Sequence, residues 1–450
     1  MFRSLKSSPS LDMIASKTNS GWFGRNESLD KNRLPPEDDQ EIKKFKIEIP
    51  QERLDDLRKR LEMAKLFESI EETNFRYGFN SQTLAYIVDY WLNQYQWREW
   101  EEKLNEMPQY VTEIEGLRIH FVHMRPENPE GVVVPLLIIH GWPGSFFEYY
   151  KAIPMLLDST NQGLSFDLII PSIPGYGFSE EPHQEGFNVV STARIFCKLM
   201  DRLGFNKFFV HGGDWGAIIS KTIALMYPER VRGIHTTLYS SSHPKGFDRW
   251  KFALAKLLPN LMIRKPSQRK MFNDLLHYRS KWYLESGYLH EQSTKPDTVG
   301  AALTDSPIGL AAYILEKFST WTDPTNIHKP DGGLMEKFRL DELLTNVMIY
   351  WFSDNVTSSM RYYKENVCPV IGAFRRYKIG TNKLSRTIPA GYAAFPNEIV
   401  RAPKFVIKMT FPNLVHYSEP RDGGHFAAFE EPRILTDDIK KFVFVVVTKL

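Results

Sequence analysis

Apolar and polar residues alternate along two neighbouring stretches of the chain, 110–114 and 117–123. Alternation predicts β-strands with one buried face, and Glu115-Gly116 between them supplies a tight turn, so the pattern predicts a hairpin. Uninterrupted apolar runs are instead typical of strands that are buried on both faces. Such a run predicts a strand at 132–139, and stretches rich in apolar residues predict further strands at 166–170, 207–211 and 231–238.

Stretches with helical periodicity separate these strands, at about 189–203 and from about 216 to 227. Strands that alternate with helices predict a mostly parallel central sheet with helices on both faces. The alternation resumes near the end of the chain. There we expect strands at 388–395 and 404–411, and a closing helix after about Glu431.

Between these two parts, residues 240–385 are helical in pattern and rich in aromatic residues, and no strand is recognisable. We interpret this stretch as an inserted helical cap. Near the N-terminus, residues 51–66 predict an amphipathic helix, and residues 82–107 predict a helix whose aromatic side chains pack against a neighbour. The predicted organisation is a disordered tail (1–44), a helical N-terminal region (45–107), a core in two parts (108–239 and 386–450) and the cap (240–385).

The composition of the chain limits which binding partners and which cellular compartment we expect. The net charge of +3 comes from 57 basic and 54 acidic residues without a concentrated basic patch, so we expect no nucleic-acid partner. Two cysteines, Cys197 and Cys368, cannot build a disulfide framework and indicate free thiols in a reducing compartment. No run of 18 apolar residues occurs, so no membrane-spanning helix is predicted. No cluster with metal-ligand spacing is visible, so we expect neither a metal nor a cofactor.

The most informative motif is Gly212-Gly213-Asp214-Trp215-Gly216, which lies between a predicted strand and a predicted helix. This is the pattern of the nucleophile elbow of the α/β-hydrolase fold, with Asp where esterases have Ser. A carboxylate is ionised at neutral pH, and it can attack a saturated carbon to form an ester that water can cleave. Asp214 therefore predicts displacement at an sp³ carbon followed by ester hydrolysis, although such an Asp can also simply cap a helix.

The remaining catalytic groups should follow in the order acid and then histidine. His425, in a glycine-bearing loop after the last predicted strand, is the candidate base, and Glu398, directly after the strand at 388–395, is the candidate acid. Asp354 is a rival acid within the predicted cap. The other histidines fit the base less well. His211 should point away within its strand, His140 should be structural, His416 precedes the loop, and the cap contains His243, His277, His290 and His328.

Negative charge that develops at the site needs hydrogen-bond donors. The elbow offers the backbone N–H of Trp215, and the loop His140-Gly141-Trp142-Pro143 offers the backbone N–H of Trp142. Pro143 donates nothing itself, because it has no N–H. We expect the two backbone N–H groups to form an oxyanion hole.

At this point a family resemblance emerges. The strings HGWPGS, GGDWGA, ESGYLHEQ, KPDTVG, RYYKEN and GGHFAAFEEP resemble signatures of the microsomal-type epoxide hydrolases, a group that includes the juvenile hormone epoxide hydrolases. The similarity runs from about Phe45 to about Pro432. It implies an α/β-hydrolase core wrapped by an N-terminal region and covered by a helical cap. It also implies Asp214 as the nucleophile, with Glu398 and His425 as its charge-relay partners.

The resemblance further implies a pair of cap tyrosines, which we map to Tyr288 and Tyr363. An epoxide oxygen becomes an alkoxide as the ring opens, and two phenol O–H donors can stabilise that charge without a strong acid. Tyr362, next to Tyr363, is the alternative second donor.

The function implied is hydrolysis of a lipophilic epoxide by water through an ester on Asp214. A haloalkane dehalogenase would also use an aspartate nucleophile, but a tyrosine pair would have no obvious task there. A non-catalytic hormone-binding receptor of the same fold is the second alternative, and the intact set of catalytic groups argues against it. Terpenoid, fatty-acid and xenobiotic epoxides all remain open as substrates, and the oligomeric state is unreadable.

Location follows from the same comparison. Microsomal-type members typically begin with a hydrophobic anchor, and no such segment is visible in this sequence. We therefore expect an intracellular protein that is cytoplasmic or peripherally associated with the endoplasmic reticulum membrane. The aromatic stretch 82–107 would be the contact surface in the second case. Thr448-Lys449-Leu450 only loosely matches the peroxisomal S-K-L address, and the threonine argues against it.

Overall fold

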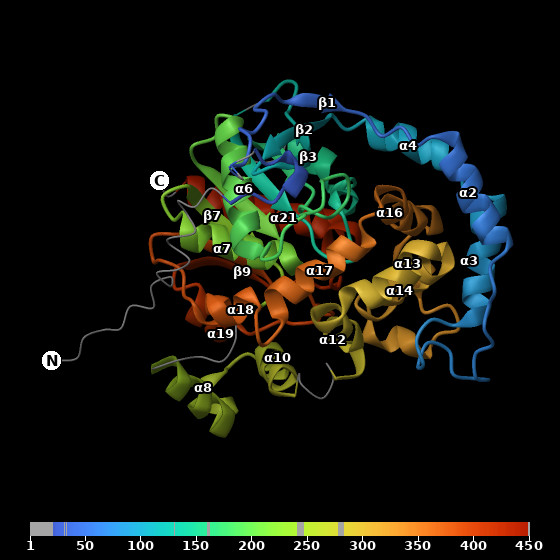
Figure 1. The fold of residues 1–450 in the computed structure, drawn as a ribbon. Coiled ribbons are helices and arrows are strands. Elements are labelled where there is room, and N and C mark those ends of the chain that lie inside the picture. Colours follow the sequence, from blue (N-terminus) through green and yellow to red (C-terminus); the bar gives the residue numbers. More distant parts are fainter. Residues whose placement is uncertain are drawn as a thin grey trace.

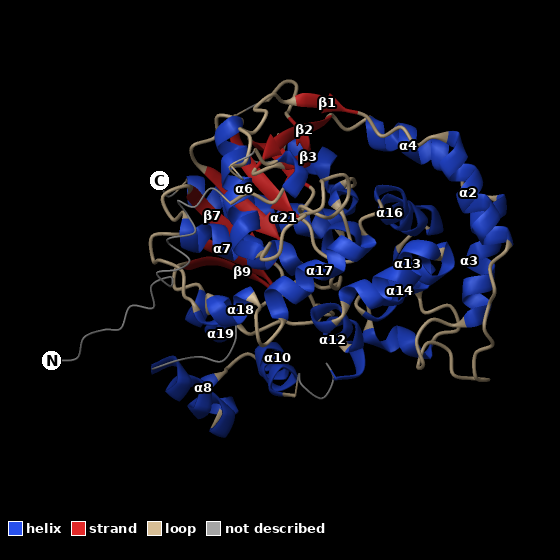
Figure 2. Cartoon of the chain, in the orientation of Figure 1, coloured by secondary structure: helices blue, strands red, loops and turns tan. Residues whose placement is uncertain are grey.

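The fold was analysed in a computed structural model that describes residues 21–30, 32, 34–129, 131–159, 163–240, 247–277 and 283–448. The first twenty residues of the predicted tail, His243 and the last two residues of the C-terminal tripeptide lie outside the described residues. Within the described ranges, helices surround one central sheet (Figures 1 and 2).

The sheet has nine strands in the order β1-β2-β3-β5-β4-β6-β7-β8-β9 within the described residues. Pairing from β1 to β5 is antiparallel, and pairing from β5 through β4 to β9 is parallel, which confirms the predicted mostly parallel sheet. The predicted hairpin pairs Ile114 with Leu117 at its turn. The strands are β1 (Lys43–Phe45), β2 (Gln109–Ile114), β3 (Leu117–Met124), β4 (Val132–Ile139), β5 (Leu164–Pro171), β6 (Phe208–Gly212), β7 (Val231–Thr236), β8 (Ala390–Ala393) and β9 (Leu414–Ser418).

Two layers of helices bury the apolar faces of this sheet. Helices α6 (Val189–Arg202) and α7 (Asp214–Met226) contact each other, and α7 also contacts β4, β6 and β7. Helices α5 (Ala152–Leu157) and α21 (Pro432–Val447) form the second layer, where α21 contacts β7, β8 and β9. This arrangement is the α/β-hydrolase fold that the sequence predicts.

The chain between β7 and β8 forms the cap, without a sheet strand among its described residues. Its principal helices α12, α13, α14, α16 and α17 lie together beside the sheet (Figure 1). Its helices are α8 (Phe247–Leu257), α9 (Pro259–Met262), α10 (Pro266–Leu276), α12 (Gly287–Thr294), α13 (Pro296–Asp305), α14 (Pro307–Thr320), η3 (Pro324–His328), α15 (Leu334–Lys337), α16 (Leu340–Ser353), α17 (Val356–Val367), α18 (Ala373–Arg376) and η4 (Ile379–Thr381).

The N-terminal region runs as a strap along the outer side of the cap, as Figure 1 shows. It consists of α2 (Gln51–Glu62), α3 (Ser81–Asn93) and α4 (Trp97–Asn105), so the single helix predicted over 82–107 is in fact two. Polar contacts fasten the strap: Arg53 donates to Asp354 at 2.8 Å, and Arg60 donates to Asp305 at 2.8 Å. The buried Tyr95 hydroxyl also hydrogen-bonds the Thr345 hydroxyl at 2.9 Å.

Two further sequence-based predictions are wrong. Residues 404–411 form helix α19 (Lys404–Thr410), and the strand follows it as β9. The residues that α19 buries include Val406, Ile407 and Thr410, which is helical spacing, and the apolar run concealed that spacing. The second error concerns the predicted tail. The described part of this stretch reaches the core at Phe23, which is buried and whose N–H donates to the Glu115 carbonyl at 2.9 Å.

Among the described residues, no single helix combines the length and the apolar composition of a membrane span. One bent pair of helices, α13 with α14, meets both criteria only when the two are taken together.

Candidate active site

Asp214 occupies a sharp turn at the carboxyl end of β6, where α7 begins. Its φ of 42° lies in the left-handed region, where non-glycine backbone is strained, as expected at a nucleophile elbow. The turn requires close backbone approach on both sides. A Cβ on Gly212 would lie 2.3 Å from the Gly216 carbonyl carbon, and a Cβ on Gly216 would lie 1.9 Å from the Ile139 oxygen. The two glycines thus allow β6, α7 and β4 to converge under Asp214.

The loop after β4 supplies a donor to this carboxylate. The backbone N–H of Trp142 donates to Asp214 Oδ1 at 2.9 Å. Cap helix α16 holds the same loop, because Asn346 donates to the Pro143 carbonyl at 2.8 Å and Tyr350 donates to the Gly144 carbonyl at 2.7 Å. Trp215, the other expected donor, is the second residue of α7, in the first turn, where backbone N–H groups have no partner within the helix.

The candidate base and acid meet Asp214 from the other part of the core. His425 Nε2 lies 3.4 Å from Asp214 Oδ2, and His425 Nδ1 lies 2.6 Å from Glu398 Oε1. Glu398 follows β8, as predicted. His425 follows β9, on a loop that Glu430 holds by accepting hydrogen bonds from the backbone N–H groups of Gly424 (2.7 Å) and Phe426 (2.8 Å). The structure thus brings the three predicted residues into one row, in which His425 hydrogen-bonds Glu398 and faces Asp214.

Electrostatics within this row favour a charged histidine. Burial lowers the pKa of His425, but the charge of Glu398, together with hydrogen bonds to Asp214 and Glu398, outweighs it and raises that pKa well above its ordinary value. Burial raises the pKa of Glu398, and the charge of His425 opposes this. An imidazolium between two carboxylates is the arrangement that these directions describe.

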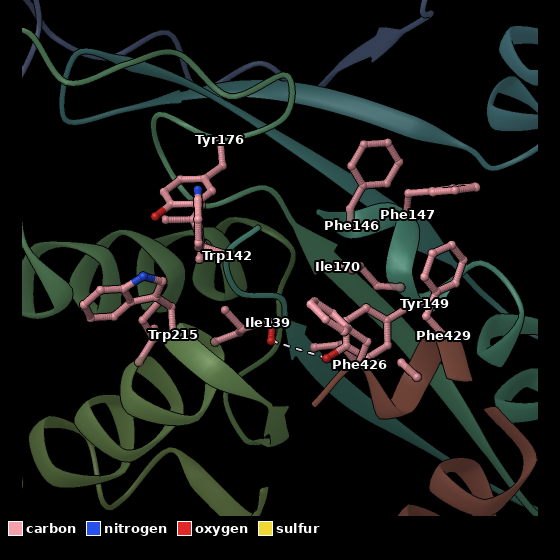
Figure 3. Close-up of a cluster of buried hydrophobic side chains, with 14 of the residues drawn as sticks. Ile139, Trp142, Phe146, Phe147, Tyr149, Ile170, Tyr176, Trp215, Phe426 and Phe429 are labelled. Carbon is pink, nitrogen blue, oxygen red and sulfur yellow. Dashed lines mark hydrogen bonds between the residues drawn. The ribbon is translucent and has the colours of Figure 1, made fainter. Parts of the chain in front are cut away.

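The two predicted tyrosines lie on neighbouring cap helices, Tyr288 on α12 and Tyr363 on α17. Their ring centroids are 5.8 Å apart. The Trp142 ring stacks on Tyr288 at 5.1 Å, and the Trp215 ring meets Tyr363 edge-on at 4.8 Å. Figure 3 shows Trp142 and Trp215 on the same side of the aromatic core. Because the rings of Tyr288 and Tyr363 pack on these two tryptophans, the tyrosine pair lies over the two loops that hold Asp214.

The hydroxyl of Tyr363 is buried and has no hydrogen-bond partner of normal geometry among the described residues. Burial also raises the pKa of Tyr363 well above its ordinary value, so the phenol keeps its proton at neutral pH. The alternative donor, Tyr362, points elsewhere, because its hydroxyl shares a 2.8 Å hydrogen bond with Thr192 on α6. The geometry therefore favours Tyr363 over Tyr362 as a donor to a bound substrate.

The rejected candidates have other partners. Asp354 is exposed and ion-paired with Arg53, far from the row in the fold. His140 accepts a hydrogen bond from the backbone of Ile173, as a structural residue would. His416 lies in β9 and faces Asp438 at 3.1 Å. The expectation for His211 is wrong in part: it contacts His235 at 2.9 Å, yet it also lines the cavity beside Asp214.

The chain is similar to known proteins over most of its length. Residues 42–149 match the family described as "Epoxide hydrolase N terminus", and residues 134–366 match the "alpha/beta hydrolase fold" family. The chain is 46% identical over 433 residues to Epoxide hydrolase 1 of Sus scrofa, which covers 94% of this chain and 92% of that relative. It is 41% identical over 414 residues to Juvenile hormone epoxide hydrolase 1 of Ctenocephalides felis. This match covers 91% of this chain and 88% of that relative.

The fold points the same way. The crystal structure of juvenile hormone epoxide hydrolase from the silkworm Bombyx mori matches with a TM-score of 0.88 and 37% identity, covering 95% of this chain and 99% of that one. The chain belongs to the epoxide hydrolase family. Epoxide hydrolases add water to an epoxide ring, and this is the activity of the chain. Epoxide hydrolysis, which the motifs favoured, is therefore retained over the dehalogenase and receptor alternatives.

Sequence reasoning missed two buried carboxyl groups of this epoxide hydrolase. Burial raises the pKa values of Glu148 and Glu430 to about 8 in each case. Glu430 stands within the string GGHFAAFEEP, five residues after His425, so its place in a family signature was a usable signal. Glu148 lies in η2 (Phe146–Tyr149), and nothing in its spacing distinguishes it from a surface glutamate.

Proposed function

We propose that this epoxide hydrolase opens lipophilic epoxides to vicinal diols through a covalent ester on Asp214. One observation carries the proposal: the Asp214 carboxylate lies 3.4 Å from His425 of the His425–Glu398 pair, and its charge also acts on the buried phenol of Tyr363 in the cap. We assign ring opening to the tyrosine pair and ester hydrolysis to the His425–Glu398 pair.

In the first reaction Asp214 attacks a ring carbon with Oδ2, because Oδ1 already accepts the hydrogen bond from the backbone of Trp142. A C–O bond of the epoxide breaks, and its electron pair moves to the ring oxygen. Tyr288 and Tyr363 donate hydrogen bonds to that oxygen, and one of them gives up its proton. No base is needed, since a carboxylate is the nucleophile.

In the second reaction His425 activates water. Ester formation removes the negative charge of Asp214, which is one cause of the raised pKa of His425, so that pKa falls once the ester exists. The imidazolium proton passes to the tyrosinate, and neutral His425 becomes a base. It takes a proton from water as water attacks the Asp214 ester carbon. Glu398 stabilises the imidazolium that re-forms.

The surroundings of the tyrosine pair favour apolar substrates. The ring centroids of Trp142, Trp215 and Trp321 each lie within 5.2 Å of the ring centroid of a tyrosine of the pair. The centroids of Trp142 and Trp321 are 6.3 Å apart. Aromatic walls with a few convergent hydroxyl groups are typical of sites for lipophilic molecules. We infer that the epoxide carries an apolar substituent.

Peripheral membrane contact is a separate part of the proposal. The aromatic stretch 82–107 cannot supply it as predicted, because Trp91, Trp97 and Trp100 are buried. Helices α8 and α9 instead expose Trp250, Leu257 and Leu261, each more than 70% accessible, next to basic residues. If these side chains contact lipid, Trp250→Ala with Leu257→Ser should reduce co-flotation with anionic vesicles and leave turnover of a water-soluble epoxide unchanged. Equal flotation of both proteins would refute this surface.

Trapping the intermediate tests the covalent mechanism. His425→Gln should still form the ester but should not hydrolyse it, because the base is missing. Mixed with an epoxide, the intact variant should gain one substrate mass, located on the peptide that contains Asp214. Asp214→Ala, made in the same background, should gain nothing. An adduct on another residue, or none while the wild type turns over, would exclude the ester on Asp214.

A chloroalkane provides the matching control for substrate class. A dehalogenase would form the same adduct from the chloroalkane with loss of halide, whereas an epoxide hydrolase with a tyrosine pair should react with the epoxide alone. Adduct formation from the chloroalkane at a comparable rate would contradict the proposed substrate class.

A further inference from the structure

A small cavity lies under Asp214, on the side of the core. It has a volume of about 20 Å³, which is enough for one water molecule. Its walls come from core segments between Gly141 and Thr237, from the loop of His425 and from Leu435 on α21, and no described residue of the cap between 247 and 385 lines it. The tyrosine pair belongs to that cap. The cavity is therefore separate from the place where the epoxide oxygen is bound.

Glu148 also lines this cavity, together with Asp214 and His425. The residue lies in η2, and its carboxyl group fills the space next to Gly144, where a Cβ would lie 1.2 Å from Glu148 Oε1. No described residue hydrogen-bonds to this carboxyl group, and only burial and the charges of His425, Asp214 and Glu430 act on it. A buried carboxyl group without a protein partner that borders a water-sized cavity is a site for water.

We propose that Glu148 holds the hydrolytic water in this cavity, next to His425 and below the ester carbon of Asp214. The inference rests on the covalent mechanism proposed above and assigns a residue to its second reaction. The water donates one hydrogen to His425 Nε2 and the other to a carboxyl oxygen of Glu148. These two contacts point the lone pair of the water oxygen at the ester carbon.

The chemical balance leaves Glu148 unchanged. The water oxygen forms a bond to the ester carbon, and one water proton moves to His425. The bond from that carbon to the alkyl oxygen then breaks, and the alkyl oxygen takes the proton from His425. The new carboxylic acid of Asp214 finally loses its proton to His425, which restores the starting imidazolium. Glu148 acts through hydrogen bonds alone.

The protonation state of Glu148 suits this task. Its pKa is raised to about 8, mainly by burial; the charge of His425 lowers this pKa, and the charges of Asp214 and Glu430 raise it. At neutral pH the group is therefore a neutral acid that can both donate and accept. A second fixed carboxylate beside Asp214 would instead repel the negative charge that develops on the ester oxygen.

Single-turnover kinetics can separate the two reactions. We expect Glu148→Ala to form the Asp214 ester at a rate within about twofold of the wild type and to hydrolyse it on the order of 100-fold more slowly, the cost typical of a misplaced reactant. The alkylated enzyme should therefore accumulate during turnover and appear by mass. Gly144→Ala is the matched variant, because its new methyl group displaces the carboxyl of an intact Glu148, and it should show the same split.

Glu148→Gln provides the control for folding. Glutamine keeps the shape and can still accept from water, so it should recover most of the hydrolysis rate. Between pH 7 and 9, ionisation of Glu148 should slow ester hydrolysis in the wild type relative to Glu148→Gln. Ester hydrolysis at the wild-type rate in Glu148→Ala, or an equal loss in both reactions, would overturn the proposal. Absence of any ester on Asp214 in the wild type would instead refute the covalent mechanism.

Discussion

Different residues surround the two carboxylate oxygens of Asp214. The Trp142 N–H fixes Oδ1, His425 faces Oδ2, and the tyrosine pair lies toward the cap. Sequence motifs predicted all of these residues, because each stands in a signature string or directly after a strand. Motifs could not predict Glu148, because its role depends on a cavity, and a cavity forms only when distant segments pack together.

The tyrosines give a prediction at this scale. Tyr363→Phe and Tyr288→Phe should each slow ester formation by about 10–1000-fold, because a donor to the developing alkoxide is lost. The rate of ester formation in a rapid-mixing experiment measures this. Tyr362→Phe is the matched control on the same helix, and its rate should stay close to the wild type, since its hydroxyl bonds Thr192. A larger loss in Tyr362→Phe than in Tyr363→Phe would reverse the assignment.

Glu430 gives a second prediction, on stability. Its pKa is raised in the folded protein to about 8, and in the unfolded chain it lies near 4.5. The folded state therefore binds the proton more tightly, so Glu430 contributes stability below about pH 4.5 that is lost as pH rises toward 8. Urea unfolding should show a smaller decline in the free energy of unfolding from pH 5 to pH 8 for Glu430→Gln than for the wild type. Parallel declines would contradict this.

At the scale of elements, hydrophobic patterning was sufficient wherever a strand is buried on both faces. The strand predicted at 132–139 coincides with β4, and the helix predicted at 189–203 coincides with α6 within one residue. Patterning failed at 404–411, where a buried helix and a buried strand show the same apolar run. The true strand β9 is only partly buried, so its hydrophobic signal is weak.

The elbow yields a prediction for this scale. Gly216→Ala should destabilise the fold strongly, because its Cβ would lie 1.9 Å from the Ile139 oxygen and neither backbone can yield easily. Gly213→Ala is the control three residues earlier, since its Cβ would meet only the Thr237 hydroxyl at 3.1 Å. Thermal unfolding should show a large drop in Tm for Gly216→Ala and a small one for Gly213→Ala. Equal values would show that the elbow tolerates a side chain.

At the scale of the whole molecule, the N-terminal strap joins the cap through contacts that no sequence pattern revealed. Arg53 and Arg60 look like ordinary surface charges of an amphipathic helix, and only the fold brings them to Asp354 and Asp305. Likewise, the contact of Phe23 with the core depends on residues almost a hundred positions away. Long-range polar pairing of this kind needs three-dimensional information.

The strap predicts a local change in stability. Tyr95→Phe removes the buried hydrogen bond to Thr345 and should destabilise the junction of strap and cap by about 1 kcal/mol, the net value of a typical hydrogen bond. Hydrogen exchange should then quicken in α16 and stay unchanged in α7. Tyr86→Phe, with an exposed ring on α3, is the control and should alter neither helix. Unchanged exchange in α16 would show that the strap does not support the cap.

The strap also limits how this enzyme can be recombined with its relatives. Exchanging residues 247–385 alone would bring in a foreign cap while the native strap still presents Arg53, Arg60 and Tyr95. Each of these side chains would then face a surface that was selected beside another strap, and Tyr95 would bury a hydroxyl without its acceptor. The cap and the segment 45–107 therefore have to be exchanged as one unit, even though the hairpin and the first half of the sheet separate them in the chain. Chimeras should transfer the two together.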